Sequence, residues 1–184
     1  MGEAEAGPVP RILLVGMMGA GKTTVGRGLA QRFGWPYLDS DEEVRRRSGK
    51  TVPQIFAEDG EAAFRVQEAA VLAEACNSDH PVIVSVAGGA VLDPENRKLI
   101  TSSGLVVWLR ASLTTLTHRV GDGRTRPLLG DDPAAALRRL YPERAALYGQ
   151  VASVVIDVDD QPTDRVVELV ARAVGERSQA GGRT

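Results

Sequence analysis

The sequence of 184 residues contains one cysteine and two histidines, and aromatic residues make up only 4% of it. A single cysteine cannot form an internal disulfide. Cys76 lies in an apolar helical pattern, so we expect a small core residue in a protein of the reducing cytoplasm. His80 and His118 are too isolated to indicate a metal cluster or a catalytic histidine. These absences exclude a disulfide scaffold and a histidine-based metal centre.

Long apolar runs and a strong charge imbalance are also absent. No apolar stretch approaches the roughly 20 residues of a membrane-spanning helix, and the first ten residues, MGEAEAGPVP, lack the apolar centre of a signal peptide. The net charge of −2 predicts no nucleic-acid or membrane-surface partner. We expect a single domain at residues 11–176, preceded by a disordered arm (1–10) and followed by a flexible tail (177–184).

The most informative stretch is Arg11–Thr24, RILLVGMMGAGKTT. The apolar run at 12–15 is typical of a strand buried on both faces, and residues 16–23 match the phosphate-binding pattern G-x-x-x-x-G-K-[ST]. Glycines let several backbone N–H groups point at a polyphosphate, and the following helix adds the positive end of its dipole. Lys22 can reach the β- and γ-phosphates, and the Thr23 hydroxyl can ligate Mg²⁺. The motif predicts binding of a nucleoside triphosphate with magnesium, but it names no reaction.

Short apolar runs alternate with helical patterns along the rest of the chain. This alternation predicts an α/β protein with the P-loop kinase fold, a five-stranded parallel β-sheet flanked by helices on both faces. The helix that begins at Pro133 should be broken at Pro142, and the last helix should end near Val174. The further strands are expected at 37–39, 82–86, 105–109 and 154–156.

A polar, glycine-rich segment at about residues 121–132 contains two arginines, Arg124 and Arg126. Such a segment cannot bury itself, so we predict a mobile lid. On closure, the two arginines could stabilise negative charge at a γ-phosphate.

Candidate functional residues also follow two other predicted strands. Ligands of parallel sheets gather at the carboxyl ends of the strands, so Asp39, Asp41, Gly88 and Gly89 should share one cleft with the phosphate loop. Asp39 is placed to hold magnesium, directly or through water, and Asp41 could accept a proton from an acceptor hydroxyl. Either aspartate could instead cap a helix. The two glycines indicate close backbone approach to a ligand, or a plain tight turn.

Two more arginines have alternative interpretations. Arg65 and Arg144 lie in helical patterns and could be ordinary surface residues. An anionic substrate would give both a function, because a guanidinium group binds a carboxylate with two parallel hydrogen bonds.

The chain resembles the shikimate kinase family from about Arg11 to Val174. The matching stretches are GMMGAGKTTVGRGLA, YLDSD, FAEDGEAAFR, VAGGAVL, RTRPLL and ERAALY. Phosphate loops are widespread, but their combination with D-x-D, E-x-x-F-R and R-P-L-L is specific. The resemblance implies transfer of the ATP γ-phosphate to the 3-hydroxyl of shikimate, in the chorismate and aromatic amino-acid pathway.

The resemblance also implies roles for individual residues. The catalytic residues would be Lys22, Asp41 and Arg126. Magnesium would be held by Thr23 and Asp39. The residues that bind ATP would be Gly19, Ala20, Gly21, Lys22, Thr23, Thr24, Arg119 (stacked on adenine) and Arg126. Shikimate would be bound by Asp41, Arg65, Gly88, Gly89 and Arg144.

Two departures from the family stand beside these roles. Ala87 replaces a glycine that the family usually has, and it restricts positive φ. No adenine-contacting arginine occurs at residues 159–162. Two alternatives also stay open: another small-molecule kinase of this fold, acting on gluconate or a nucleoside monophosphate, and a non-catalytic ATP-binding module. The few acceptor-side cations favour a small carboxylate substrate, and nothing in the sequence requires more than a monomer.

Overall fold

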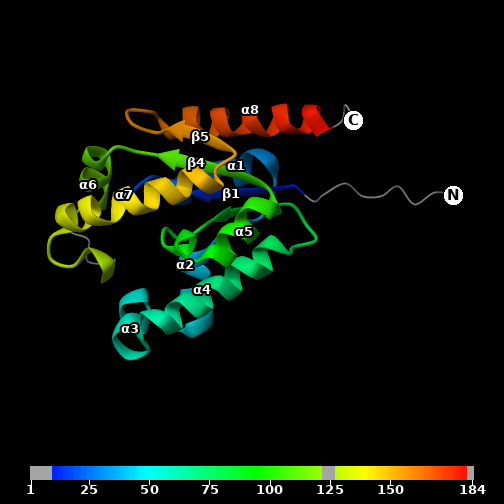
Figure 1. The fold of residues 1–184 in the computed structure, drawn as a ribbon. Coiled ribbons are helices and arrows are strands. Elements are labelled where there is room, and N and C mark those ends of the chain that lie inside the picture. Colours follow the sequence, from blue (N-terminus) through cyan, green and yellow to red (C-terminus); the bar gives the residue numbers. More distant parts are fainter. Residues whose placement is uncertain (1–9, 122–126, 182–184) are drawn as a thin grey trace.

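The computed structural model of the chain describes residues 10–121 and 127–181. Its centre is a fully parallel sheet with the strand order β2-β3-β1-β4-β5 (Figure 1). The predicted five-stranded parallel sheet is therefore confirmed. The strands are β1 (Arg11–Val15), β2 (Tyr37–Asp39), β3 (Val82–Ser85), β4 (Leu105–Arg110) and β5 (Val154–Asp157).

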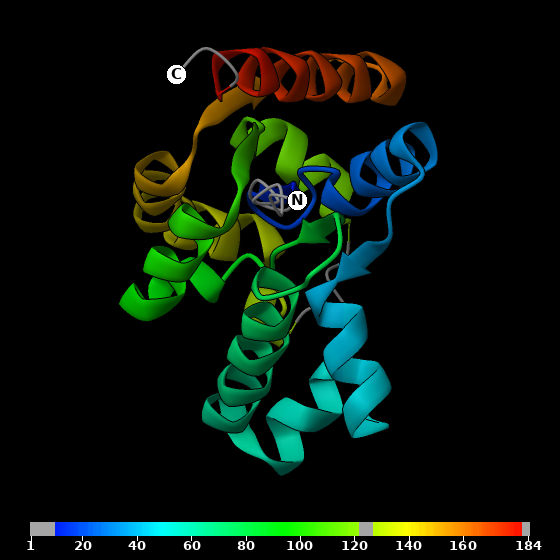
Figure 2. The ribbon, with the colours of Figure 1, turned by 90° about the vertical axis from the view of Figure 1, so that its right-hand side faces the viewer.

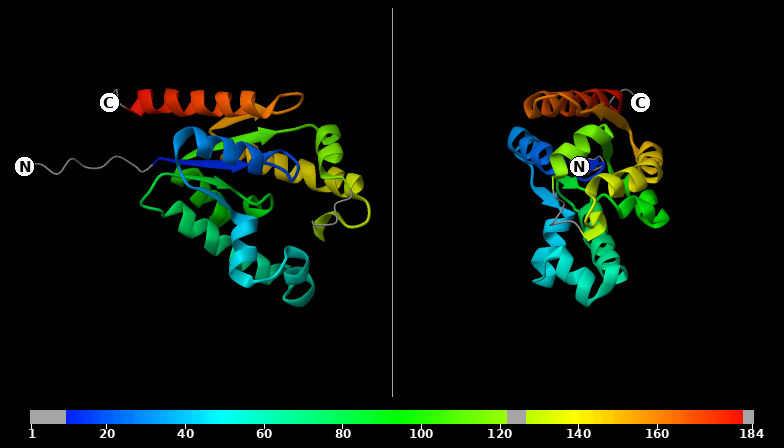
Figure 3. Two further views of the ribbon diagram at one scale, coloured as in Figure 1. Left: turned by 180° about the vertical axis from the view of Figure 1, so that it is seen from behind. Right: turned by 90° about the vertical axis from the view of Figure 1, so that its left-hand side faces the viewer.

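Helices cover both faces of the sheet, as predicted. Helices α1 and α8 lie together over one face, and α5 and α7 lie over the other (Figure 2). Helices α2, α3 and α4 project beyond the edge strand β2 (Figure 3). The helices are α1 (Lys22–Phe33), α2 (Ser40–Ser48), α3 (Val52–Glu58), α4 (Gly60–Cys76), α5 (Pro94–Ser103), α6 (Leu113–Val120), α7 (Pro133–Val151) and α8 (Thr163–Gly181), with short 3₁₀ turns η1 (Ala90–Leu92) and η2 (Pro127–Leu129). Within the described residues, none of these helices is both long and apolar enough to cross a membrane.

Side-chain caps explain where several helices begin. Thr51 forms a capping box with Gln54 at the start of α3. Asp93, Ser112 and Asp132 each accept a hydrogen bond from a backbone N–H in the first turn of α5, α6 and α7. Such caps satisfy N–H groups that have no partner inside the helix.

Two helices differ from the sequence prediction. Helix α7 is continuous through Pro142, where we expected a break. A proline removes one helical hydrogen bond, but Leu137 and Tyr148 are buried on either side of it, so core packing keeps both halves helical. Helix α8 continues to Gly181 rather than ending near Val174, so residues 178–181 are helical instead of part of a frayed tail.

Some predicted segments lie outside the described residues. They are residues 1–9 of the predicted N-terminal arm, residues 122–126 of the predicted lid, which include Arg124 and Arg126, and residues 182–184 at the C-terminus.

The apolar interior has two parts. The main cluster packs on both faces of the sheet and includes Cys76, whose predicted core position is confirmed and whose thiol pKa is raised by burial. A smaller cluster lies within the projecting helices. Helices α2, α3 and α4 therefore have a local core of their own, which consists of Val44, Ile55, Phe64 and Val71.

Candidate active site

The turn between β1 and α1 forms a cradle of backbone amides. Gly16, Gly19 and Gly21 have φ values of +144°, +84° and +91°, a region that glycine adopts at little cost. Gly21 is the N-cap of α1, and no side chain caps this end of the helix. The first N–H groups of α1 and the positive end of its dipole are therefore available to an anion.

Lys22 lies at the start of this helix and bends back over the turn. Its Nζ atom donates hydrogen bonds to the carbonyl oxygens of Gly16 (2.7 Å) and Met17 (3.2 Å). This conformation holds the ammonium group above the cradle, where a phosphate oxygen can replace the carbonyl oxygens.

Asp39 links the cradle to the next strand. It ends β2, caps α2 through the N–H groups of Asp41 and Glu42, and accepts a hydrogen bond from Thr23 Oγ1 (2.9 Å). The helix cap that the sequence offered as one interpretation of Asp39 is therefore present, and the same carboxylate also contacts Thr23. The resulting pair of a hydroxyl and a carboxylate consists of the oxygen ligands that Mg²⁺ prefers.

A second group of charged side chains comes from two segments that are distant in the sequence, α4 and α7. Arg65 in α4 donates to Glu68 (2.8 Å) and Glu61 (2.9 Å). Glu68 is only 1% exposed, and Arg144, from α7, is only 2% exposed. Arg144 Nε and Nη1 and one oxygen of Glu68 are buried without a hydrogen-bond partner among the described residues. Buried charges without full pairing are costly, which indicates a place prepared for a charged ligand.

Burial and ion pairing have opposite effects on the pKa values of Glu68 and Arg65. Burial raises the pKa of the Glu68 carboxyl, although the guanidinium group of Arg65 opposes the rise. Burial lowers the pKa of Arg65, but Glu68 and Glu61 outweigh it, so that this pKa is raised overall. Arg65 therefore stays cationic beside the site.

Gly88 and Gly89 follow β3 and pass close to these arginines. A Cβ atom on Gly89 would lie 2.5 Å from Arg65 Nη1, so a larger residue there would displace the guanidinium group from its present position. The carbonyl oxygen of Gly88 accepts a hydrogen bond from the hydroxyl of Tyr148 (2.6 Å). The described neighbours of the two glycines are protein side chains, and close backbone approach to a ligand stays a prediction.

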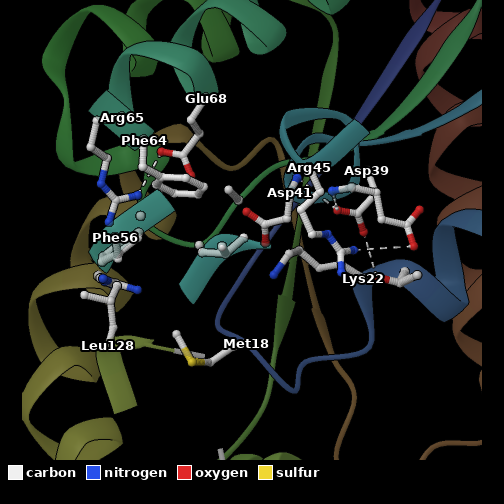
Figure 4. Close-up of a pocket in the computed structure, with 17 residues that line it drawn as sticks. Met18, Lys22, Asp39, Asp41, Arg45, Phe56, Phe64, Arg65, Glu68 and Leu128 are labelled. Carbon is white, nitrogen blue, oxygen red and sulfur yellow. Dashed lines mark hydrogen bonds and ion pairs between the residues drawn. The ribbon is translucent and has the colours of Figure 1, made fainter. Parts of the chain in front are cut away.

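Two adjoining cavities contain these residues. The loop cavity, of about 310 Å³, is lined by the turn after β1 together with Thr24, Ser85 and Arg119. The arginine cavity, of about 220 Å³, is lined by the charged group and by an apolar wall (Figure 4). They meet at residues that line both, which are Met18, Lys22, Thr23, Asp39, Asp41 and Ala87.

Most residues predicted from the sequence line one or both cavities. Ala20 is an exception, because it is buried and lines neither. Arg119 lines the loop cavity and donates to the carbonyl oxygen of Val158 (3.2 Å). The predicted catalytic Arg126 lies outside the described residues.

Ala87 does not strain the turn after β3. Among the described non-glycine residues, a positive φ occurs at Asp160 and not at Ala87. Its N–H donates to Ser40 Oγ (2.9 Å), and the residue is buried. The sequence-based concern about this position therefore has no basis in the backbone conformation.

Several residues of the site were not found by sequence reasoning. Glu68 follows Arg65 by three positions, a spacing that indicates a helical ion pair, but its burial could not be read from the pattern. The helical part of the apolar wall, and Arg45 on α2, were missed because their helices looked like ordinary amphipathic or solvated elements, whereas Met18 lies in the turn after β1 and Leu128 in η2. The apolar wall consists of Met18, Val52, Phe56, Phe64 and Leu128.

A glycine cradle at a helix N-terminus, a lysine above it, an adjacent hydroxyl–carboxylate pair and a second cavity for an anion define a P-loop phosphotransferase that acts on a small molecule. A family model described as shikimate kinase matches residues 18–174. The chain belongs to the shikimate kinase family, whose members use ATP to phosphorylate shikimate.

Individual relatives agree with this assignment. The chain is 45% identical to a shikimate kinase from Ruegeria pomeroyi over 167 residues, which cover 90% of this chain and 85% of the relative. It is 48% identical to a shikimate kinase from Bordetella pertussis over 158 residues, 85% of this chain and 74% of the relative. Among solved structures, shikimate kinase from Acinetobacter baumannii in complex with shikimate matches with a TM-score of 0.87 and 36% identity, over 92% of this chain and 94% of the other.

Proposed function

We propose that this enzyme transfers the γ-phosphate of ATP to the 3-hydroxyl of shikimate, giving shikimate 3-phosphate and ADP for chorismate and aromatic amino-acid biosynthesis. The observation that carries this proposal is Arg144, which is 2% exposed, lines the arginine cavity beside the phosphate-binding turn, and has two guanidinium nitrogens without a hydrogen-bond partner among the described residues. A carboxylate is the ligand that a guanidinium group binds most strongly. The related enzyme from Acinetobacter baumannii was solved with shikimate, a ring that bears one carboxylate.

On the nucleotide side, the phosphates of ATP would be bound by the turn after β1. The amides of residues 19–24 surround them, Lys22 contacts the β- and γ-phosphates, and Arg119 contacts the adenine. Residues 19–24 include the buried Ala20, whose contribution would come from its backbone alone.

Magnesium would also bind on the nucleotide side of the site. The described residues contain no group of three or more His, Cys, Asp or Glu side chains that could hold a metal alone. Mg²⁺ is commonly bound by one or two protein oxygens together with substrate phosphates, and Thr23 and Asp39 provide such oxygens. The ion would offset charge on the phosphate oxygens. Asp39 already accepts hydrogen bonds on both oxygens, which favours an outer role in which it orients Thr23.

On the acceptor side, Arg65, Arg144 and the backbone at Gly88 and Gly89 would hold the carboxylate and ring hydroxyls. Asp41 lines both cavities. Its carboxylate would accept the proton of the 3-hydroxyl while the hydroxyl oxygen forms a bond to the γ-phosphorus. The bond from that phosphorus to the β,γ-bridging oxygen breaks, and ADP leaves with the electron pair.

The apolar wall supports a ring substrate over an open polyol chain. Val52, Phe56 and Phe64 line the arginine cavity beside its charged group, and the Arg65 guanidinium lies over the Phe64 ring (Figure 4). A cyclohexene ring can pack against such side chains, whereas each hydroxyl of gluconate placed there would lose its hydrogen bonds to water.

A coupled assay of ADP formation tests the substrate. We expect turnover with shikimate and only background rates with gluconate, AMP or CMP. Calorimetry with shikimate in the presence of a non-hydrolysable ATP analogue should give a clear binding signal. Comparable turnover of gluconate or a nucleotide, or no heat with shikimate, would overturn the proposal.

We also propose that the enzyme acts as a cytoplasmic monomer. Nothing in the sequence requires more than a monomer, and the buried Cys76 suits a reducing compartment. Light scattering coupled to gel filtration should give a mass near the 19.6 kDa of the chain. A stable larger species would contradict this part of the proposal.

A further inference from the structure

Tyr37 lies beside the site but lines neither cavity. It precedes Asp39 by two positions on β2, so the two side chains share a face of the sheet, and Ser85 pairs opposite Asp39 on β3. The ring of Tyr37 packs against α1 at Gly26, where a Cβ atom would overlap it. This packing brings the phenol oxygen to 3.1 Å from Asp39 Oδ2 and 2.8 Å from Ser85 Oγ.

The Asp39 carboxylate consequently receives four hydrogen bonds. Oδ1 accepts from the N–H groups of Asp41 (3.1 Å) and Glu42 (3.3 Å), and Oδ2 accepts from Thr23 (2.9 Å) and Tyr37 (3.1 Å). A carboxylate offers about four lone-pair positions, so the described donors fix its orientation from both sides.

The direction of these bonds follows from the chemistry of the groups. A phenol has one proton and a carboxylate can only accept, so Tyr37 donates to Asp39 and the Ser85 hydroxyl donates to Tyr37. Ser85, Tyr37, Asp39 and Thr23 thus form one hydrogen-bonded chain that joins β3, β2 and α1.

We propose that Tyr37 is a positioning residue for the metal–nucleotide site: it holds Asp39 in the orientation that fixes the Thr23 hydroxyl toward the bound ion. The inference rests on the roles proposed above for Thr23 and Asp39. Without the phenol, Oδ2 loses one of its two donors, and the carboxylate can turn away from Thr23. Loss of such an outer partner commonly weakens metal binding by roughly 10- to 100-fold.

The test uses the Tyr37→Phe variant, which keeps the ring in place against Gly26 and removes only the hydroxyl. Mn²⁺ is titrated into the protein–ADP complex and followed by electron paramagnetic resonance, which reports metal binding without turnover. We expect Mn²⁺ affinity to fall about tenfold. The affinity for ADP in the presence of EDTA, and the affinity for shikimate, should stay at the wild-type values.

Tyr141→Phe is the matched control, because it removes a tyrosine hydroxyl from α7 outside both cavities. Wild-type Mn²⁺ affinity in Tyr37→Phe would overturn the inference, and so would an equal loss of ADP affinity in EDTA, which indicates a general structural defect. Neither result depends on shikimate, so a failure here is distinguishable from a failure of the proposed reaction.

A second variant tests the position of the ring. Gly26→Ala should displace Tyr37 and weaken Mn²⁺ binding by itself. It should add little in the Tyr37→Phe background, because the hydroxyl is already absent. Independent, additive losses would show that Gly26 acts through something other than the phenol.

Discussion

The loop cavity and the arginine cavity adjoin, but they are built in different ways. The loop cavity depends mainly on one continuous turn, whose glycine conformations and helix N-terminus present backbone N–H groups. The arginine cavity depends on side chains from α4 and α7 and on the turn after β3. Three residues of its apolar wall, Val52, Phe56 and Phe64, belong to α3 and α4, which share a small core with α2.

This difference separates two ways of recognising an anion. Backbone amides at a helix N-terminus bind phosphate with little dependence on distant residues. Buried or half-buried arginines need partners that hold them in one orientation, and Glu68 and Glu61 supply these for the half-buried Arg65. Substitutions should therefore affect nucleotide binding, acceptor binding, chemistry and stability separately.

The largest effect is expected from Lys22→Ala, which acts on the nucleotide side. Loss of the ammonium group should lower kcat about a thousandfold, because it removes a preorganised charge from the transferring phosphate. Shikimate affinity, measured by calorimetry without nucleotide, should not change. Lys98→Ala, an exposed lysine paired with Glu95, is the control. Near-normal turnover would refute the proposed role of Lys22.

Asp41→Asn tests the boundary between the two cavities. An amide cannot take the proton of the 3-hydroxyl, so kcat should fall about a hundredfold or more. The affinity for ATP analogues should stay near the wild-type value, and Asp164→Asn on α8 should have no effect. If only the KM for ATP changed, Asp41 would belong to nucleotide binding instead.

Arg144→Lys tests the arginine cavity alone. Lysine keeps the charge but loses the planar fork. We expect kcat/KM for shikimate to fall about 30-fold, which corresponds to ~2 kcal/mol of charge-assisted hydrogen bonding. Calorimetry should show unchanged binding of ATP analogues, and Arg138→Lys on the same helix should behave as wild type. Equal losses for both ligands would mean that the two cavities are not separable.

The smallest effect concerns the surface ion pairs that join α2 to α4. Glu43 pairs with Arg46 (2.7 Å) and Arg47 (2.6 Å), and Arg47 also pairs with Glu74 (2.6 Å). Hydrogen bonds from Arg46 and Arg47 lower the pKa of Glu43 from 4.5 to about 2. Because the folded-state pKa is the lower one, this stabilisation is present above pH 4.5 and is lost as the pH falls toward 2.

Glu43→Gln should therefore lower the free energy of unfolding by about 0.5 kcal/mol at pH 7, the usual size for partly exposed pairs. Urea denaturation should show this deficit shrinking below pH 4.5 and in high salt. Glu95→Gln, which breaks a fully exposed pair with Lys98, should cause no measurable loss. A deficit that persists at pH 2 would exclude the ion pairs as its cause.

The fold and the loop cavity were largely predictable. Strand positions followed from short apolar runs, and the phosphate loop followed from glycine spacing within residues 16–23. The errors came where distant packing outweighed a local signal. Pro142 lies within α7 because buried neighbours hold the helix on both sides, and α8 extends past its apolar pattern to Gly181.

The arginine cavity was predictable only in part. The local sequence favoured surface positions for Arg65 and Arg144, and a family resemblance was needed to propose that they bind a substrate. Glu68 and Tyr37 carried no signal of function, because their roles depend on burial and on contacts with other elements.

By itself, the amino-acid sequence determined the phosphate loop, the alternation of strands and helices, and membership of a kinase family. All three rest on neighbours close along the chain, where residue type and spacing control conformation directly. Only the tertiary structure decided which charges are buried, which carboxylates hold Arg65, and which hydroxyl orients Asp39. The reason is physical: desolvation and hydrogen-bond geometry depend on atoms that folding brings together from segments far apart in the chain.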